Sequence, residues 1–489
     1  MRILQLSAEI FPLLKTGGLA DVAGALPAAL HAQGVETRVL LPGFPAILGA
    51  LQHRAAVDHF RTPWGEQGLV LYGELPAIRV GGQPLRAYVL DAPDLFDRPG
   101  NPYLDDKGRP YADNLRRFAA LGWAAAHLGT DLDRHWRPDL VHGHDWHAGL
   151  AMAALHWQHR RHGLPRVPTV FTVHNLAYQG LFERREFADL GLPPEAFDIE
   201  GLEFYGQVSF MKAGLYYADR ITTVSPTYAR EIQTADQGCG LDGLLRTRQH
   251  RLSGILNGVD AAVWSPATDA LLPARYDAAD LGGKAACKAA FQAQVGLDVE
   301  AGAPLFTVVS RLTEQKGLHL VEAGIETLVA AGAQLFVQGT GEPGLEEAFT
   351  RASARWPGRV ATFLGYDEAL AHRVFAAGDV TLVPSRFEPC GLTQMYGLTY
   401  GCVPLVRGVG GLADTVVDAD LATLEDGTAT GVVFHDFSAG GFVHAVRCAL
   451  ALYRRPQDWA RVQQRGMGQV LGWEKAAGEY VGVYRGLLG

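Results

Sequence analysis

The sequence predicts an α/β protein built from two doubly wound domains in tandem, and three observations support this prediction. At 489 residues the chain is longer than one hydrophobic core usually organises. Short apolar runs of strand length alternate with helical stretches in both halves, a pattern typical of mostly parallel sheets covered on both faces. The five residues Gly-Gly-Leu-Ala-Asp occur at 17–21 and again at 410–414. A repeat near opposite ends of one chain suggests two halves that face a shared site.

The first domain is expected over residues 1–256. It opens with an apolar run from Ile3 to Ile10, and an Ala- and Leu-rich helix follows from about Leu19 to Gln33. Further strands are predicted at Arg38–Leu41, Leu85–Leu90, Leu140–His142, Thr169–Val173 and Ile221–Val224. In such sheets ligands bind outside the carboxyl ends of the strands, so the loops after these runs are the expected site.

The second domain is expected over residues 257–472. Its first stretch, about 257–283, is rich in Asp, Pro and Ala and weakly periodic, which indicates an inter-domain connection. A second alternating series then predicts strands at Leu305–Val309, Gln334–Val337, Val360–Leu364, Val380–Val383 and Val403–Val406. The final helix, about 473–489, is expected to pack back on the first domain. Two such domains placed face to face would form a cleft from their strand ends.

Composition excludes several classes of function. The 43 Lys and Arg residues against 52 Asp and Glu give a net charge of −9, which disfavours unspecific binding to nucleic acid or a membrane surface. The five cysteines form no C-x-x-C pair, so neither a disulfide framework nor a zinc ribbon is indicated. The N-terminus lacks a signal-peptide pattern and no apolar run is long enough to span a bilayer, so a reducing cytosol is expected.

The turn from Lys15 to Asp21 is predicted to bind an anion. Gly17 and Gly18 let the backbone approach a ligand closely, and the N–H groups that open the following helix carry partial positive charge. Lys15 adds a full charge, so a phosphate is the most plausible ligand. The alternative is a tight turn with a solvated lysine.

Two turns of the second domain have a related design. Arg311 and Lys316 follow a strand and could grip a diphosphate, the alternative being a solvated loop with a Glu314–Lys316 contact. After the run at 380–383, the turn 384–393 leads to a helix start, where Gly391, Leu392 and Thr393 would present N–H groups. Glu388 would disfavour a phosphate unless it serves neutral sugar hydroxyls, and the alternative is a helix N-terminal charge.

Histidines follow two strands of the first domain. His142, His144 and His147 with Asp145 could form a metal site, but no fourth ligand has a firm spacing. Hydrogen-bonding histidines at strand ends are the favoured interpretation. The sequence 174–180 begins with His174 and Asn175 at a second strand end.

Two motifs are interpreted as coincidental. Gly339–Gly344 matches G-x-G-x-x-G, but it follows the second strand of its domain rather than the first, which favours a nucleotide-facing turn over NAD binding. Asp131-Leu132-Asp133 looks like a metal-binding D-x-D, yet the pattern recurs at 418–420, and no metal is predicted.

Together these motifs resemble those of the bacterial glycogen synthases, ADP-glucose-dependent glucosyltransferases related to plant starch synthases. The similar stretches run in order across nearly the whole chain: 15–21, 97–100, 142–147, 174–180, 212–219, 256–260, 310–317, 384–393 and 410–414. The resemblance implies a GT-B fold with a deep interdomain cleft. It also implies a cytoplasmic enzyme that transfers glucose from ADP-glucose to the non-reducing 4-hydroxyl of an α-1,4-glucan, with retention, no metal and no cofactor.

The resemblance also implies roles for individual residues. The first domain, with its Lys15 loop, would be the acceptor side, and the second would bind the nucleotide sugar. The implied catalytic set is His174 against the transferring glucose, Arg311 and Lys316 on the leaving diphosphate, Glu388 on glucose hydroxyls, and Asp145 toward the acceptor. The implied donor-binding set is Lys15, Gly17, Gly18, Asp21, Asn175, Asn257, Tyr366 against adenine, Cys390, Gly391, Leu392 and Thr393.

Two positions depart from the wider pattern. Phe96 stands where family members often carry Tyr, which would remove a hydroxyl near the donor sugar. Tyr396 stands eight residues after Glu388, where retaining GT-B enzymes often have a second Glu, which weakens the expected ribose contact. The competing hypotheses are a non-catalytic glucan-binding or regulatory relative and an NAD-dependent oxidoreductase that uses Gly339–Gly344.

Overall fold

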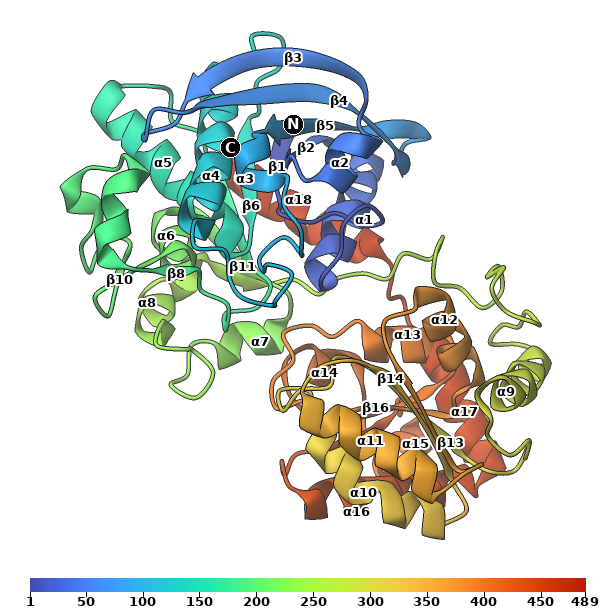
Figure 1. The fold of residues 1–489 in the computed structure, drawn as a ribbon. Helices are drawn as coiled ribbons and strands as arrows, with labels where there is room; N and C mark the ends of the chain where they lie inside the picture. Colours follow the sequence, from blue (N-terminus) through green and yellow to red (C-terminus); the bar gives the residue numbers. More distant parts are fainter. The chain divides into compact units, whose positions relative to one another are not determined.

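The computed structural model describes residues 1–489, apart from the side chain of Gln67. The chain divides into two compact units, drawn in Figure 1. Unit 1 comprises Met1–Gly258 and Trp473–Gly489, and unit 2 comprises Val259–Gly472. Each unit is an α/β domain around a largely parallel sheet, which confirms the predicted fold class.

The main sheet of unit 1 has the strand order β12-β11-β7-β6-β1-β2-β5-β4-β3. Its strands are β1 (Arg2–Leu6), β2 (Glu36–Pro42), β3 (Gln52–Arg61), β4 (Gln67–Val80), β5 (Gln83–Asp91), β6 (Leu140–His144), β7 (Thr169–Val173), β11 (Arg220–Thr223) and β12 (Leu252–Gly254). From β12 to β5 all pairs are parallel. Strands β6 and β7 are buried along their whole length, as expected for strands covered on both faces.

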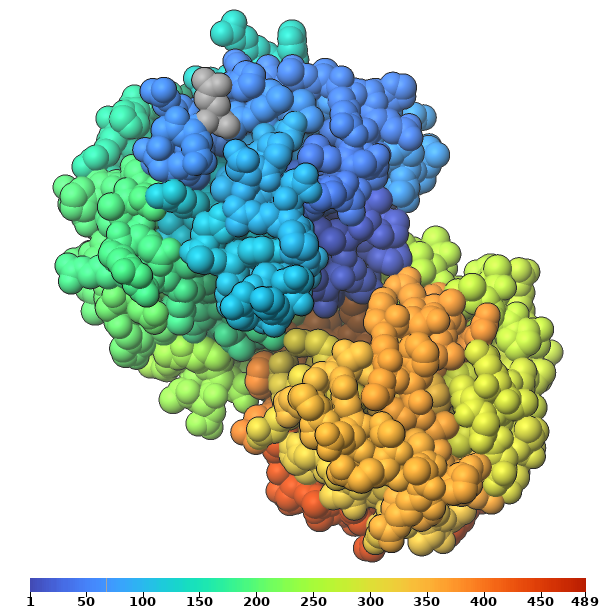
Figure 2. Space-filling view, in the orientation of Figure 1, coloured from blue at the N-terminus to red at the C-terminus, as the bar shows by residue number. Residues whose placement is uncertain are grey.

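An antiparallel edge of unit 1 was not predicted. Strands β3 and β4 pair antiparallel with each other, and β4 pairs antiparallel with β5, so two long strands border the sheet (Figure 1). Strand β3 is mostly exposed and rich in polar residues, so it lacks the apolar run that marks the central strands. The face of unit 1 drawn in Figure 2 is formed by residues from the first half of the chain, coloured blue to green.

Helices cover both faces of this sheet. On one face, α1 (Gly18–Ala32) packs against the C-terminal α18 (Trp473–Leu488) in a cluster that includes Ile3. Leu4 and Leu6 belong to the opposite cluster, with α4 (Asn114–Thr130) and α5 (Trp146–His162), because alternate residues of a strand point to opposite faces. The remaining elements are α2 (Pro45–Ala50), α3 (Pro93–Phe96), α6 (Phe210–Tyr217), α7 (Pro226–Glu231), α8 (Asp242–Thr247), the short helices at Arg184–Leu190, Pro194–Ala196 and Gln249–Arg251, and a small antiparallel sheet of β8 (Leu181–Phe182), β9 (Glu203–Phe204) and β10 (Gln207–Ser209).

Unit 2 contains a fully parallel sheet with the order β15-β14-β13-β16-β17-β18. Its strands are β13 (Leu305–Val309), β14 (Gln334–Gly339), β15 (Val360–Leu364), β16 (Val380–Val383), β17 (Val403–Arg407) and β18 (Val432–Phe434). Its helices are α9 (Gly282–Val295), α10 (Leu318–Ala330), α11 (Pro343–Arg355), α12 (Glu368–Ala377), α13 (Thr393–Thr399), α14 (Gly410–Thr415), α15 (Leu421–Asp426), α16 (Ala439–Tyr453) and α17 (Pro456–Met467).

The stretch expected to connect the domains packs instead on unit 2. Trp264 is stacked between His372 and Tyr396, with ring centroids 3.8 and 3.9 Å away. Asp269 accepts a hydrogen bond from Tyr400 and lies 2.6 Å from the His372 ring. The chain therefore passes between the units at Gly258–Val259 and Gly472–Trp473, and Asn257 belongs to unit 1.

Candidate functional site

In unit 1, three neighbouring parallel strands end at the candidate residues. Strands β7, β6 and β1 are adjacent in the sheet, and their carboxyl ends lead to His174, to Asp145 and to the turn before α1. The carboxyl ends of adjacent parallel strands meet at one edge, which brings these loops together.

The turn before α1 carries a lysine and an open glycine. Strand β1 ends at Leu6 rather than Ile10, and α1 begins at Gly18. A Cβ on Gly17 would meet no atom within 4 Å, so the backbone there is open to an approaching ligand. Lys15 Nζ donates to Asp21 Oδ1 at 2.8 Å, which holds the ammonium over the first turn of the helix.

Glu9 and Tyr103 belong to this turn and were not predicted from the sequence. Thr16 donates its hydroxyl to Glu9 Oε1 at 2.6 Å and its amide to Glu9 Oε2, and the Tyr103 hydroxyl also donates to Glu9. Burial and the Glu9 carboxylate raise the pKa of Tyr103 well above its usual value. A charged residue within the apolar run 3–10 was the available signal for Glu9, whereas Tyr103 lies 94 residues away in the sequence.

The histidines form a buried, uncharged group. His144 Nδ1 lies 3.0 Å from His174 Nε2, and the His142 and His144 rings lie 4.2 Å apart. Burial lowers the pKa of His142, His147 and His174 to about 3, and that of His144 well below its usual value. These rings are therefore neutral at physiological pH and act as hydrogen-bonding groups, as the sequence analysis favoured.

Asp145 connects the two histidine loops. Its backbone is left-handed, with φ of 62°, and its carboxylate accepts from the amides of His174 at 3.2 Å and Asn175 at 3.4 Å. Burial raises its pKa to about 7 in spite of these two amides, and Glu9 contributes in the same direction. Asp145 thus fixes the loop that begins with His174.

In unit 2, the candidate side chains follow the adjacent strands β13 and β16. Lys316 Nζ donates to Glu388 Oε2 at 2.7 Å, and the Ser385 hydroxyl donates to the same oxygen at 2.8 Å. Glu388 is only 6% exposed. Glu314 pairs with Arg386 at 2.6 Å, so the Glu314–Lys316 contact considered from the sequence is not the one that forms.

A glycine allows these two turns to pack closely. Gly317 has a φ of 72°, and a Cβ there would lie 2.1 Å from the Pro384 carbonyl oxygen. The amide of Arg386 donates to the carbonyl of Gln315 at 2.8 Å, which joins the turns further. The turn that carries Arg311 and Lys316 therefore lies beside the turn that carries Glu388.

The second turn ends at a helix start. Helix α13 begins at Thr393, and the preceding Gly391 has a φ of 73°, a conformation that favours glycine. Cys390 is buried, and Gln394 donates to its carbonyl and to that of Gly391. Gly391, Leu392 and Thr393 thus stand at the amino end of a helix, beside the Glu388 carboxylate.

Two further candidates lie at other strand ends. Tyr366 follows β15, is 67% exposed, and donates its hydroxyl to Glu368 at 2.6 Å. Asn257 follows β12 in unit 1 and is buried, and within the described residues its Oδ1 accepts no hydrogen bond.

The second Gly-Gly-Leu-Ala-Asp sequence is used for packing. A Cβ on Gly410 would lie 1.9 Å from the Glu388 carbonyl oxygen, and one on Gly411 would lie 2.0 Å from that of Cys390. The Gly411 amide donates to Glu388 and Pro389 carbonyls. This copy packs against the Glu388 turn, whereas the space around Gly17 in the first copy is open.

The two motifs judged coincidental have structural roles. Cβ atoms on Gly339 and Gly341 would lie 1.8 and 2.2 Å from the carbonyl oxygens of Ser310 and Leu312, so these glycines let the end of β14 and the turn after it pack against the Arg311 turn. Asp133 accepts from Tyr88 at 2.6 Å and lies 3.6 Å from Arg38. In the part of the chain that the structure describes, no three His, Cys, Asp or Glu side chains are grouped so that they could hold a metal.

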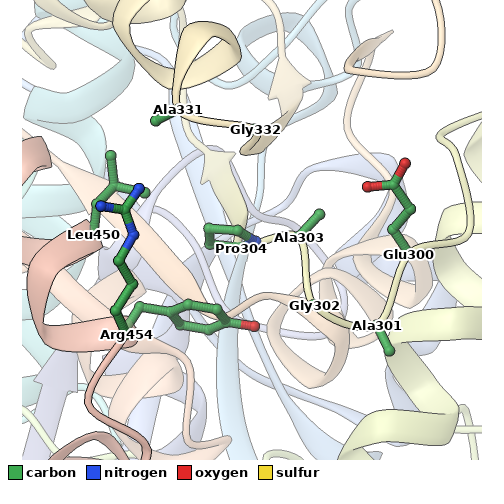
Figure 3. Close-up of a pocket in the computed structure, with 10 residues that line it drawn as sticks. Glu300, Ala301, Gly302, Ala303, Pro304, Ala331, Gly332, Leu450 and Arg454 are labelled. Atoms are coloured by element: carbon green, nitrogen blue, oxygen red, sulfur yellow. The ribbon is translucent and has the colours of Figure 1, made fainter.

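A large hollow in unit 2 lies away from all these residues. Its volume is about 680 Å³, and it opens at the amino ends of β13 and β14, between Pro304, Gly332, Leu450 and Arg454 (Figure 3). None of the candidate residues lines it. Because ligands of doubly wound sheets bind at the opposite, carboxyl ends, this hollow is not the candidate site.

Phe96 and Tyr396, the two positions that depart from the wider family pattern, both pack against aromatic rings. Phe96 is fully buried and packs edge-on against Phe44 at 5.4 Å, so a hydroxyl there would enter the core of unit 1. Tyr396 lies on α13 and stacks on Trp264, so its ring helps to join the 259–281 stretch to the sheet of unit 2.

The state of the cysteines and the hydropathy of the helices can also be read from the structure. Among the described residues, none of the five cysteines forms a disulfide bond. No helix of the described chain is both long enough and apolar enough to cross a membrane.

Two Rossmann-like domains with basic and glycine-rich turns at their strand ends define a two-domain glycosyltransferase, and the comparisons with known proteins agree. The model of the starch synthase catalytic domain matches residues 2–247, and that of glycosyl transferases group 1 matches 294–465. Glycogen synthases of Variovorax paradoxus and Leptothrix cholodnii are 60% and 57% identical over 100% and 99% of this chain and 99% of each relative. The chain belongs to the glycogen synthase family.

A solved structure agrees with this membership. The catalytic domain of starch synthase IV from Arabidopsis thaliana, bound to ADP and acarbose, has a TM-score of 0.89 and 31% identity. The match covers 100% of this chain and 99% of that one. Both the family and the fold predicted from the sequence are therefore confirmed.

Proposed function

We propose that this chain transfers glucose from ADP-glucose to the non-reducing 4-hydroxyl of an α-1,4-glucan, with retention of configuration and without a metal. The observation that carries the proposal is the Lys316–Glu388 pair, in which a buried carboxylate and an ammonium share one strand-end site. Membership of the glycogen synthase family and the similarity to a starch synthase bound to ADP and acarbose support it.

The pair explains how a carboxylate is tolerated beside a phosphate site. Lys316 and Ser385 both donate to Glu388, so its charge is already balanced. An ammonium has three N–H donors, and one of them is used by Glu388, which leaves two for a diphosphate oxygen. The second oxygen of Glu388 can then accept hydrogen bonds from neutral sugar hydroxyls.

Charge on the leaving diphosphate would be stabilised by fixed donors. Arg311 offers a planar fork and Lys316 a point charge. The N–H groups of Gly391, Leu392 and Thr393 at the start of α13 add partial positive charge. Preorganised donors of this kind contribute about 3–4 kcal/mol each to transition-state stabilisation, which makes a metal unnecessary.

Unit 1 would hold the sugar. In this proposal the carbonyl and ring of His174 lie against the glucose whose anomeric centre becomes oxocarbenium-like. Neutral rings suit this role, since a charged imidazolium would oppose the developing positive charge. Asp145 would lie toward the acceptor, where a carboxyl with a pKa of about 7 can exchange a proton near physiological pH.

The remaining candidates would bind the donor's ends. Lys15, with Gly18 and the open backbone at Gly17, would contact the distal phosphate, and Asp21 would orient Lys15. Tyr366 is exposed and would stack on adenine. Asn175, Asn257 and Cys390 are proposed as further donor contacts.

Because the proposed donor contacts come from both units, we also propose that the units close around the donor. Closure would exclude water and limit hydrolysis of the donor. The hinges would be the two chain passages at Gly258–Val259 and Gly472–Trp473, since 260–280 packs on unit 2.

The proposal is tested with a panel of nucleotide sugars and short maltooligosaccharides, scoring incorporation of labelled glucose. Incorporation from ADP-glucose is expected, and it should survive exhaustive chelation. Loss of activity that manganese or magnesium restores would contradict the metal-independent mechanism. Absence of transfer from any donor would favour a glucan-binding relative without activity.

A further inference from the structure

The C-terminal helix reaches the histidine group of unit 1 from the sheet face that it covers together with α1. Tyr484 of α18 is fully buried, and its hydroxyl lies 2.8 Å from His142 Nδ1. The two residues are 342 positions apart in the sequence. A helix that follows unit 2 in the chain thus supplies a polar group to the interior of unit 1.

Both nitrogens of His142 are engaged. His142 Nε2 lies 2.6 Å from the Thr172 hydroxyl, which lies 2.5 Å from the Thr222 hydroxyl. A neutral imidazole has one donor and one acceptor nitrogen, and a hydroxyl can either donate or accept, so Tyr484 and Thr172 together fix the angle of the His142 ring.

The fixed His142 ring packs against the ring of His144. The two ring centroids are 4.2 Å apart with an interplanar angle of 36°. On its other side, His144 Nδ1 lies 3.0 Å from His174 Nε2, and these atoms share one hydrogen. The ring of His174 is therefore held by His144, and that of His144 lies against His142.

The tautomer of this pair follows from one unpaired atom. His144 Nε2 is buried and has no hydrogen-bond partner within the described residues. A buried bare nitrogen is less unfavourable than a buried N–H without an acceptor, so His144 carries its hydrogen on Nδ1 and donates it to His174. His174 then carries its own hydrogen on Nδ1, an atom that no described residue bonds.

We propose that His144 and Tyr484 are positioning residues for the transfer reaction, which together hold His174 with Nδ1–H available to a substrate oxygen. Tyr484 holds the His142 ring, which packs against the His144 ring. His144 in turn determines the tautomer and the ring orientation of His174. This inference rests on the proposed function for the transfer reaction and for the identity of its substrate. The tautomer itself is a property of the protein without substrate.

The first test compares two tyrosines of the same helix. Tyr484→Phe keeps the ring and removes the hydroxyl that bonds His142. Tyr480→Phe is the matched control, since its ring is also buried near His142, with a centroid distance of 5.4 Å, but its hydroxyl makes no bond to that residue. Tyr484→Phe should lower kcat roughly tenfold with KM for the donor within about twofold, the loss that one neutral hydrogen bond accounts for.

The second test separates a donor at Nδ1 from simple packing. The amide nitrogen of asparagine stands as many bonds from Cβ as Nδ1 does, so His144→Asn retains a donor toward His174, whereas His144→Leu fills the space without one. The kcat of His144→Asn should stay above about a tenth of the wild-type value. The kcat of His144→Leu should be at least about tenfold lower than the wild-type value.

The tautomer is read directly from ¹⁵N–¹H correlation spectra of histidine-labelled protein without substrate. His174 should show Nδ1–H in the wild type and in Tyr480→Phe, with a mixed or altered signal in His144→Leu. An Nε2–H signal for His174 in the wild type would overturn the inference. So would equal kcat values for the two tyrosine variants. A wild type with the Nδ1–H signal but no glucose transfer would refute the proposed function alone.

Discussion

Unit 1 and unit 2 both present candidate residues at the carboxyl ends of parallel strands, but the histidine group of unit 1 and the Lys316–Glu388 pair of unit 2 differ in charge. In unit 1 the buried rings of His144, His147 and His174 are kept neutral by burial. In unit 2 an ammonium and a carboxylate, Lys316 and Glu388, form a pair on two adjoining turns. A neutral pocket suits a sugar that develops positive charge, and a basic turn suits a diphosphate that develops negative charge.

The two copies of Gly-Gly-Leu-Ala-Asp differ in the same informative way. Gly17 has open space around its Cβ position, whereas a Cβ on Gly410, the equivalent position of the second copy, would lie 1.9 Å from the Glu388 carbonyl oxygen. The first copy can receive a ligand, and the second holds the Glu388 turn in place. Identical sequences thus take different roles because their surroundings differ.

The largest effect is expected when Arg311 or Lys316, the basic side chains proposed to bind the diphosphate in unit 2, is removed. Replacing Lys316 or Arg311 with Ala should lower turnover by roughly two to three orders of magnitude, as for loss of one transition-state donor. Steady-state kinetics with ADP-glucose measures the loss, and thermal unfolding checks that the fold is kept. Lys475→Ala, on the exposed face of α18, is the control for an equal loss of charge. Near-normal turnover in Lys316→Ala would remove this turn from the mechanism.

The glycine pair sharpens the comparison between the two copies. Gly411→Ala should destabilise unit 2 by about 1–3 kcal/mol, since a Cβ would lie 2.0 Å from the Cys390 carbonyl oxygen. Gly17→Ala should leave the free energy of unfolding within about 0.5 kcal/mol, because its φ of −162° is open to any residue. Denaturant unfolding compares the two variants. Equal stability of both would show that the second copy is not a packing element.

The neutral histidines predict a pH dependence of stability that belongs to unit 1. His147 has its pKa lowered to about 3 by burial, so between pH 6.5 and 3 the unfolded chain binds a proton that the folded protein does not. Stability is therefore full above the unfolded pKa and is lost as the pH falls, by up to ~1.4 kcal/mol per pH unit for each such ring. His147→Phe should reduce this slope between pH 6.5 and 5, as measured by urea unfolding.

Asp145 gives the opposite sign and serves as the control. Its pKa is raised to about 7, so between pH 4 and 7 the folded protein holds a proton that the unfolded chain releases. Its contribution to stability falls as the pH rises, and Asp145→Asn should steepen the loss on acidification. Hydrogen exchange resolved by unit should place both effects in Met1–Gly258 rather than in unit 2.

How well the strands could be predicted from the sequence depends largely on how deeply each strand is buried. Thr169–Val173, Leu305–Val309 and Val380–Val383 have the predicted bounds, because central strands buried on both faces are continuous apolar runs. Val360–Leu364 also has the predicted bounds, although this strand lies at the edge of its sheet and is only partly buried. Strand β3 was missed because this exposed edge strand is rich in polar residues. Strand β4 beside it was missed because Gly73, Glu74 and Pro76 interrupt its apolar residues.

Within the site, residue types were predictable and partners were not. Lys316 and Glu388 were both named from the sequence, but their ion pair joins positions 72 residues apart, which only the order of β13 and β16 in the sheet explains. Glu9 was missed because it was taken as part of the first strand, which ends at Leu6. The neutrality of the histidines depends on burial by α5 and α18, which no local pattern reveals.

The most direct test of the division of roles between the charged Lys316–Glu388 pair and the neutral histidine group is the binding of ADP alone, measured by calorimetry in two variants. Lys316→Ala removes a charged donor to the diphosphate and should weaken ADP binding roughly tenfold or more. His174→Ala should bind ADP within about twofold of the wild type and yet transfer glucose slowly, since its role is at the sugar. A loss of ADP affinity in His174→Ala equal to that in Lys316→Ala would contradict the account.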